Sequence, residues 1–89
     1  MISNELMDKH NIINVWSSSQ KANNNIGFKR AFLGECADGR WLVVTTDDLW
    51  EESEVLLLNT RSTAMVKIRK RGFYTRISKI YTAKRRASV

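Results

Sequence analysis

Apolar and polar residues alternate in short blocks along most of this chain, and turn-forming residues separate the blocks. Alternation with a period of two is typical of strands that bury one face in a sheet. We therefore predict five strands, over residues 28–36, 40–46, 55–58, 64–70 and 73–81. Asp38-Gly39 provides the turn between the first two, because Asp-Gly readily adopts the positive φ angles of a tight hairpin.

The fourth predicted strand, residues 64–70, contains both apolar and basic residues in alternation. Ala64, Val66 and Ile68 share the face that we expect to be buried. Lys67 and Arg69 point to the opposite face, toward solvent. This alternation predicts a basic surface on the outside of the sheet.

Two of the strands alternate less regularly and leave a helix as an alternative. These are residues 73–81 and residues 28–33, where a helix would end at Gly34. Residues 17–25 are rich in Ser and Asn, which favour turns, and are predicted to form a polar loop. Residues 47–54 are predicted to form an acidic connection.

A short helix is predicted near the N-terminus, over about residues 3–10. Ser3 can cap it by accepting a hydrogen bond from a backbone N–H group. Ile2 and Met7 have the spacing of a hydrophobic staple around such a cap. Residues 11–17 fit either a continuation of this helix or a strand.

These elements predict a mainly β protein with one short N-terminal helix. Several short strands with tight turns suggest a strongly bent antiparallel sheet, or a barrel of the size of SH3-like and OB-like folds. The 89 residues are expected to form one small domain. It would comprise a helix and polar loop (1–27), a β core (28–81) and a basic tail (82–89).

The charges of this chain are divided unequally between its two parts. Residues 1–54 contain five basic and nine acidic side chains, whereas residues 55–89 contain ten basic side chains and no acidic one. The net charge of +6 conceals this division. A basic segment of this kind favours binding to a polyanion or to an acidic protein surface.

We predict that the protein binds nucleic acid through this segment. The candidate residues are Lys67, Arg69, Lys70, Arg71, Tyr74, Arg76 and Lys79. The cations would contact phosphates, and Tyr74 could stack on an unpaired base. The alternatives are a small accessory or inhibitor protein that docks on an acidic surface of a partner, and a solvated basic face with its aromatic residues in the core.

The sequence predicts neither an enzyme nor a cofactor or metal site. His10 and Cys36 are single residues of their kind, too few for a zinc site or for a nucleophile and its base. The carboxylates of residues 47–54 match no calcium loop, so we expect a solvated loop. This loop could also meet the basic face of a second copy in a homodimer.

The three tryptophans, Trp16, Trp41 and Trp50, are expected in the core, although an exposed one could anchor a partner.

No apolar run is long enough to cross a membrane, and a single cysteine fits a reducing compartment, so we expect a cytoplasmic protein without membrane contact. The tail Arg85–Val89 resembles the substrate motif of cyclic-AMP-dependent protein kinase, with Ser88 as acceptor.

Overall fold

The computed structural model of this chain describes residues 2–19, 30–46 and 52–83. The described elements are helix α1 (Asn4–Lys9), strands β1 (Ile12–Ser19), β2 (Arg30–Cys36), β3 (Trp41–Thr46) and β4 (Glu52–Leu58), helix α2 (Arg61–Lys70) and strand β5 (Ser78–Thr82).

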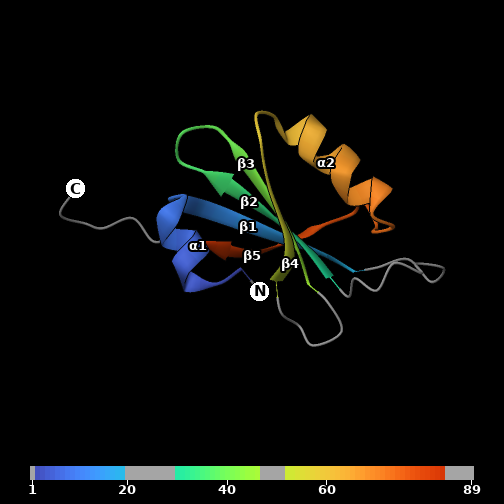
Figure 1. The fold of residues 1–89 in the computed structure, drawn as a ribbon, viewed down its shortest axis with the longest axis horizontal. Helices are drawn as coiled ribbons and strands as arrows, with labels where there is room; N and C mark the ends of the chain where they lie inside the picture. The colour runs from blue at the N-terminus through green and yellow to red at the C-terminus, as the bar shows by residue number, and fades with distance from the viewer. Residues whose placement is uncertain (1, 20–29, 47–51, 84–89) are drawn as a thin grey trace.

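The five strands form one sheet in the order β4-β3-β2-β1-β5, and all neighbours in it are antiparallel. Strands β1 to β4 follow one another as a meander (Figure 1). The chain then passes through α2, and β5 pairs with β1 at the opposite edge. The prediction of a mainly β protein with five antiparallel strands and a short N-terminal helix is confirmed. The sheet is not closed, so it is an open sheet and not a barrel.

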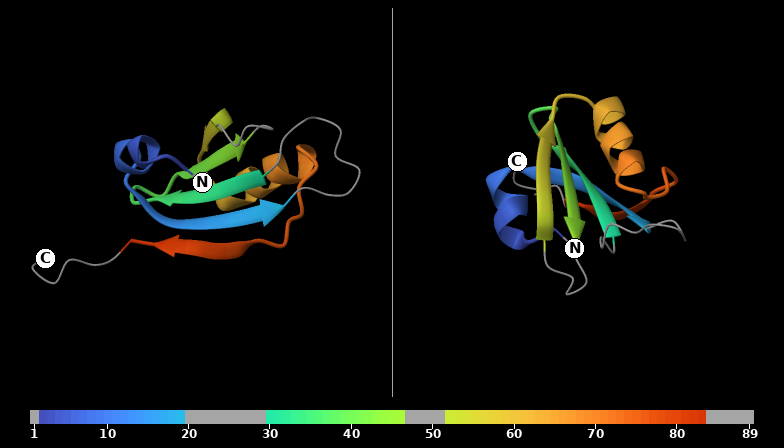
Figure 2. Two further views of the ribbon diagram at one scale, coloured as in Figure 1. Left: turned by 90° about the horizontal axis from the view of Figure 1, so that it is seen from below. Right: turned by 45° about the vertical axis from the view of Figure 1, so that its right-hand side comes forward.

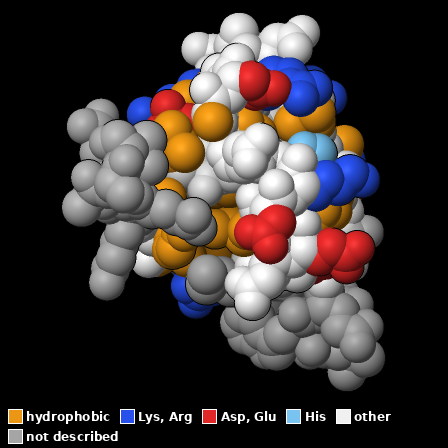
Figure 3. Space-filling model, turned by 90° about the vertical axis from the view of Figure 1, so that its left-hand side faces the viewer, with side chains coloured by type: hydrophobic (Ala, Val, Ile, Leu, Met, Phe, Trp, Pro, Cys, Tyr) orange, Lys and Arg blue, Asp and Glu red, His pale blue; other side chains and the backbone are white. Residues whose placement is uncertain are grey.

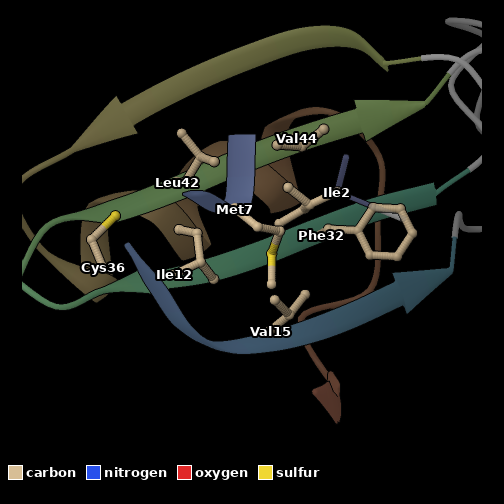
Figure 4. Packing of buried hydrophobic residues seen from close by; sticks show 8 residues of the cluster. All are labelled: Ile2, Met7, Ile12, Val15, Phe32, Cys36, Leu42 and Val44. Carbon is tan, nitrogen blue, oxygen red and sulfur yellow. The ribbon is translucent and has the colours of Figure 1, made fainter. Parts of the chain in front are cut away.

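The two helices lie on opposite faces of the sheet (Figure 2). Strand pleating therefore divides the apolar residues into two clusters. The cluster on the α1 face consists of Ile2, Met7, Ile12, Val15, Phe32, Cys36, Leu42 and Val44. Figure 4 shows how Ile2 and Met7 reach the side chains of the strands. Gly34 leaves room for the Ile12 side chain in this cluster, because a Cβ atom at position 34 would lie 3.1 Å from Cδ1 of Ile12.

The cluster on the other face lies under α2, which packs on β3 and β4. Its buried members are Ala31, Leu33, Val43, Ala64, Ile68 and Phe73. Trp16 and Trp41 are half-buried at its margin, as are Met65 and Ile77.

The prediction of a strand over residues 64–70 is wrong, because these residues belong to α2. The alternation of apolar residues misled the assignment, since Ala64 and Ile68 also have the four-residue spacing of one helix face. Both are fully buried, whereas Val66 is 38% exposed. Thr60 fixes the start of the helix, because its side chain accepts a hydrogen bond from the backbone N–H of Thr63.

The segment after α2 is also less extended than predicted. Gly72 has a positive φ angle of 86°, and Phe73 is fully buried within the cluster under α2. The strand that forms the ladder with β1 is Ser78–Thr82, which covers the end of the predicted strand 73–81.

The N-terminal half agrees more closely with the prediction. Leu6 donates its backbone N–H to the Ser3 hydroxyl, so Ser3 caps α1 as expected. Gly39 adopts a φ angle of 91° in the predicted turn between β2 and β3. The ambiguous segment 11–17 lies mostly in β1.

Other predictions for this half need correction. The alternative helix over 28–33 is wrong where it is described, because residues 30–33 lie in β2. The predicted loop 17–25 is wrong for residues 17–19, which also lie in β1. Its remaining residues are outside the described ranges, as is Trp50, which we expected in the core.

The acidic connection is shorter than predicted, because Glu52 and Glu54 already belong to β4. Among the described residues, no helix is both long and apolar enough to cross a membrane.

Candidate basic and aromatic surface

The predicted binding residues are distributed over α2, β5 and the segment between them. Lys67, Arg69 and Lys70 occupy the last turn of α2, where cations interact favourably with the helix dipole. Because residues two positions apart on a helix point about 200° apart, Lys67 and Arg69 lie on different sides of α2. The prediction that strand pleating places them on one face is therefore wrong.

Arg71, at the C-terminal end of α2, is paired with an acidic residue of the sheet. Its Nε and Nη2 atoms each donate a hydrogen bond of 2.7 Å to the two carboxylate oxygens of Glu54 in β4. The hydrogen bonds to Glu54 and the charge of its carboxylate raise the pKa of Arg71. This residue consequently holds α2 against β4 and is committed within the chain.

Tyr74 is placed at the end of β1 and remains accessible. Its backbone N–H donates to the Ser19 carbonyl oxygen at 3.2 Å, and its own carbonyl oxygen accepts a hydrogen bond from the Ser18 hydroxyl. The side chain is 47% exposed. Lys70 and Arg76 are exposed as well, and the role predicted for Tyr74 stays a prediction.

The most closely associated group of aromatic and basic side chains includes residues that the sequence did not single out as a site. The rings of Trp16 in β1 and Trp41 in β3 have their centroids 5.8 Å apart, with their planes inclined by 35°. The Arg61 guanidinium lies 5.1 Å from the Trp16 ring and 5.7 Å from the Trp41 ring. Lys79 Nζ lies 5.3 Å from the Trp16 ring. We call these four residues the tryptophan platform.

Strand register explains how the tryptophan platform forms. Trp16 pairs with Leu33 of β2 and with Lys79 of β5, so all three lie on the α2 face. Trp41 pairs with Glu35, two residues further along β2, on the same face. Since α2 packs on β3 and β4, it leaves this side of the face accessible to the side chains of β1 and β5.

The helix supplies further cations on the same side. Arg61, Met65 and Arg69 are four residues apart and follow one stripe of α2. Because Arg61 lies over both tryptophan rings, this stripe borders the tryptophan platform. Arg69 is exposed and thus extends the row of positive charge along the helix.

Three polar side chains from neighbouring strands, Asn14, Glu35 and Thr82, form a hydrogen-bonded row beside the platform. Asn14 donates from Nδ2 to the Glu35 carboxylate at 2.8 Å, and Thr82 donates its hydroxyl to Asn14 Oδ1 at 3.0 Å. Glu35 is the acidic residue in this row, and its contact with Asn14 occupies one of its oxygens.

The opposite end of the molecule has a different charge pattern. Acidic and basic side chains lie close together on the face nearest α1, with hydrophobic surface between them (Figure 3). That face therefore lacks the excess of positive charge found around α2 and β5.

His10 and Cys36 are not part of this surface. His10 ends α1 and is half-buried, and Cys36 is buried with a free thiol at the end of β2. Burial, together with the negative charge of Asp38, raises the pKa of the Cys36 thiol. Within the described ranges, no group of three or more His, Cys, Asp or Glu side chains could hold a metal ion.

Of the predicted residues, only Lys79 belongs to the tryptophan platform. Trp16, Trp41 and Arg61 were missed as a group because their proximity depends on the pairing of distant strands. The sequence signal that could have indicated the platform was the position of each tryptophan within a strand of alternating apolar and polar residues. Comparison with protein-family models, curated proteins and solved structures found no match to this chain.

Proposed function

We propose that this protein is a non-enzymatic binding protein that holds single-stranded nucleic acid without sequence selectivity. The observation that carries the proposal is the tryptophan platform, where one guanidinium lies over two neighbouring indole rings. Bases stack both on aromatic rings and on Arg guanidinium planes. Arg61 is exposed, so an unpaired base can stack on it or take its place on the rings.

The surrounding charge supports binding of the sugar–phosphate backbone. Lys79 belongs to the platform, Arg69 is exposed further along α2, and residues 55–89 contain no acidic side chain. Tyr74 contacts Ser18 and Ser19, two and three residues beyond Trp16, which places it about 7–10 Å further along β1. An extended strand would contact both aromatic positions, with Lys79 beside the first of them.

A single strand is favoured over a duplex because the faces of paired bases are covered by their neighbours. Stacking on an aromatic side chain is worth about 1–3 kcal/mol per base and tolerates any base. Recognition by stacking and phosphate contact therefore implies weak dependence on sequence and strong dependence on salt.

The test is fluorescence anisotropy with a labelled oligonucleotide of about 12 nucleotides, offered as a single strand and as a duplex. We expect tighter binding of the single strand, and an affinity that falls between about 50 mM and about 200 mM salt. Arg61→Glu combined with Lys79→Glu should weaken binding by more than about tenfold, since both cations contact the tryptophan platform.

A matched control separates this surface from net charge. Lys9→Glu combined with Arg40→Glu changes one lysine and one arginine at exposed positions in α1 and near the turn before β3. It lowers the net charge by the same amount and should affect binding much less. Equal losses in both double variants, or no binding at low salt, would contradict the proposal. The second result would favour docking on an acidic protein surface instead.

A further inference from the structure

The outer edge of β4 is the second surface of this protein that is suited to binding. β4 is the terminal strand of the sheet, and among the described residues it pairs only with β3 (Figure 1). A strand in this position presents a row of backbone N–H and C=O groups to its surroundings, and another extended chain can pair with them.

The side chains near this edge are apolar and accessible. Val55 is 43% and Leu57 is 38% exposed, although their partners in β3, Val44 and Leu42, are fully buried. The apolar α1 face of the sheet therefore continues to the edge of the molecule. Residues 55–58 contain no proline and no charge, the features with which proteins usually prevent pairing at an edge.

The opposite edge of the sheet differs in these respects. β5 carries Lys79, and its register with β1 shifts next to Ile80. A charged side chain and a register shift both hinder the addition of another strand. In β4 the register shift lies at the start of the strand, at the partners of Thr45 and Thr46, away from residues 55–58.

On the face of the sheet covered by α2, basic side chains of the helix lie beside β4. Arg71 reaches Glu54 of β4 from the end of α2. Lys67 lies one helical turn earlier and thus on the same side of α2, facing β4. The Glu54 carboxylate is paired with Arg71, and among the described residues no carboxylate is paired with Lys67. The charge of Lys67 can therefore attract a carboxylate from a chain that lies along the edge.

We propose that β4 binds an extended segment of a partner protein as a sixth strand of the sheet. Successive side chains of a strand point to opposite faces, so the segment would place apolar residues beside Val55 and Leu57 and acidic residues beside Lys67. A second copy of this chain fits less well. Pairing of β4 with itself about a two-fold axis normal to the sheet places both α2 helices on one face, and each α2 carries basic and no acidic side chains, so the two helices repel.

The probe is a labelled peptide of alternating Val and Glu long enough to span β4, compared with a Val and Lys peptide of equal length. Binding is measured by anisotropy, and nuclear magnetic resonance follows the backbone amides of the full chain. We expect the Val/Glu peptide to bind more tightly and to protect β4 amides from hydrogen exchange. The amides of β5 should be unaffected.

Two equivalent substitutions localise the site. Val55→Lys and Val66→Lys each replace an exposed valine by lysine, the first at the β4 edge and the second on α2. Val55→Lys should weaken peptide binding by at least about fivefold, and Val66→Lys should leave it nearly unchanged. Leu57→Lys provides a second edge variant if Val55→Lys perturbs the fold.

Several outcomes would overturn the proposal. These are equal binding of the two peptides, absence of binding to both, retention of affinity in both edge variants, or protection of amides outside β4. Self-association through β4, detected as a dimer by light scattering that Val55→Lys abolishes, would assign the edge to a second copy instead. None of these readouts depends on nucleic acid, so the proposed function and this inference can fail separately.

Discussion

At the scale of single residues, Arg61 links the packing of the fold to the proposed function. It is the first residue of α2, and its guanidinium lies over the rings of Trp16 and Trp41. A cation over an aromatic ring contributes about 0.5–2 kcal/mol, depending on how far it is removed from water. The same contact therefore helps to hold the first turn of α2 on the sheet and keeps the guanidinium over the rings, where we propose that a base stacks.

Cys36 gives a prediction at this scale. Burial raises the pKa of its thiol in the folded protein, so the thiol ionises more readily in the unfolded chain. As the pH rises through the ordinary pKa of cysteine, the unfolded state loses its proton first, and the free energy of unfolding falls. This contribution is complete below that pKa and is lost above it.

We expect the stability advantage of wild type over Cys36→Ala to shrink between about pH 7 and about pH 10. Urea denaturation of both proteins at each pH measures it. Every other ionisable group is common to both proteins, so the difference isolates the thiol. An advantage that stays constant across the range would contradict the assignment.

At the scale of elements, α2 shows where an alternating pattern is insufficient. Ala64, Val66 and Ile68 satisfy a strand, but Ala64 and Ile68 alone satisfy a helix that buries one stripe. The flanking residues decide between the two. Thr60 caps the helix at its start, and Gly72 adopts a positive φ angle just beyond its end, as is common after helices.

The two secondary structures make different predictions for Val66 and Ile68. In the helix, Ile68→Ala removes a fully buried side chain and should lower the free energy of unfolding by about 2–5 kcal/mol. Val66→Ala removes an exposed one and should change it by less than about 1 kcal/mol. Urea denaturation of both variants checks this. Similar losses at the two positions would support a strand and contradict the helix.

At the scale of the whole molecule, local sequence signals predicted where the strands lie better than they predicted which residues of different strands meet. Asp38-Gly39 and the residues around it predicted β2 and β3 to within about two residues, because a hairpin depends on neighbouring sequence. The tryptophan platform depends instead on registers between β1, β2 and β3. Trp16 and Trp41 meet only because Leu33 and Glu35, which pair with them, share one face of β2.

The fold separates two surfaces that differ in chemistry. The tryptophan platform lies on the α2 face over β1 and β3, toward the β5 edge of the sheet. The apolar edge lies at β4, where Val55 and Leu57 continue the α1 face of the sheet. A small protein arranged in this way could hold a nucleic-acid strand on one surface and an extended segment of a partner on the other.

The central claim is that bases stack on the tryptophan platform. Trp50→Phe leaves Trp16 and Trp41 as the only tryptophans in the chain. The fluorescence of this variant, excited at a wavelength that tyrosine does not absorb, therefore reports on the platform alone. The measurement is a titration of this variant with an unlabelled single strand at low salt. We predict quenching of the tryptophan fluorescence with the same midpoint as binding measured by anisotropy. Unchanged fluorescence while the strand is bound would contradict stacking at Trp16 and Trp41.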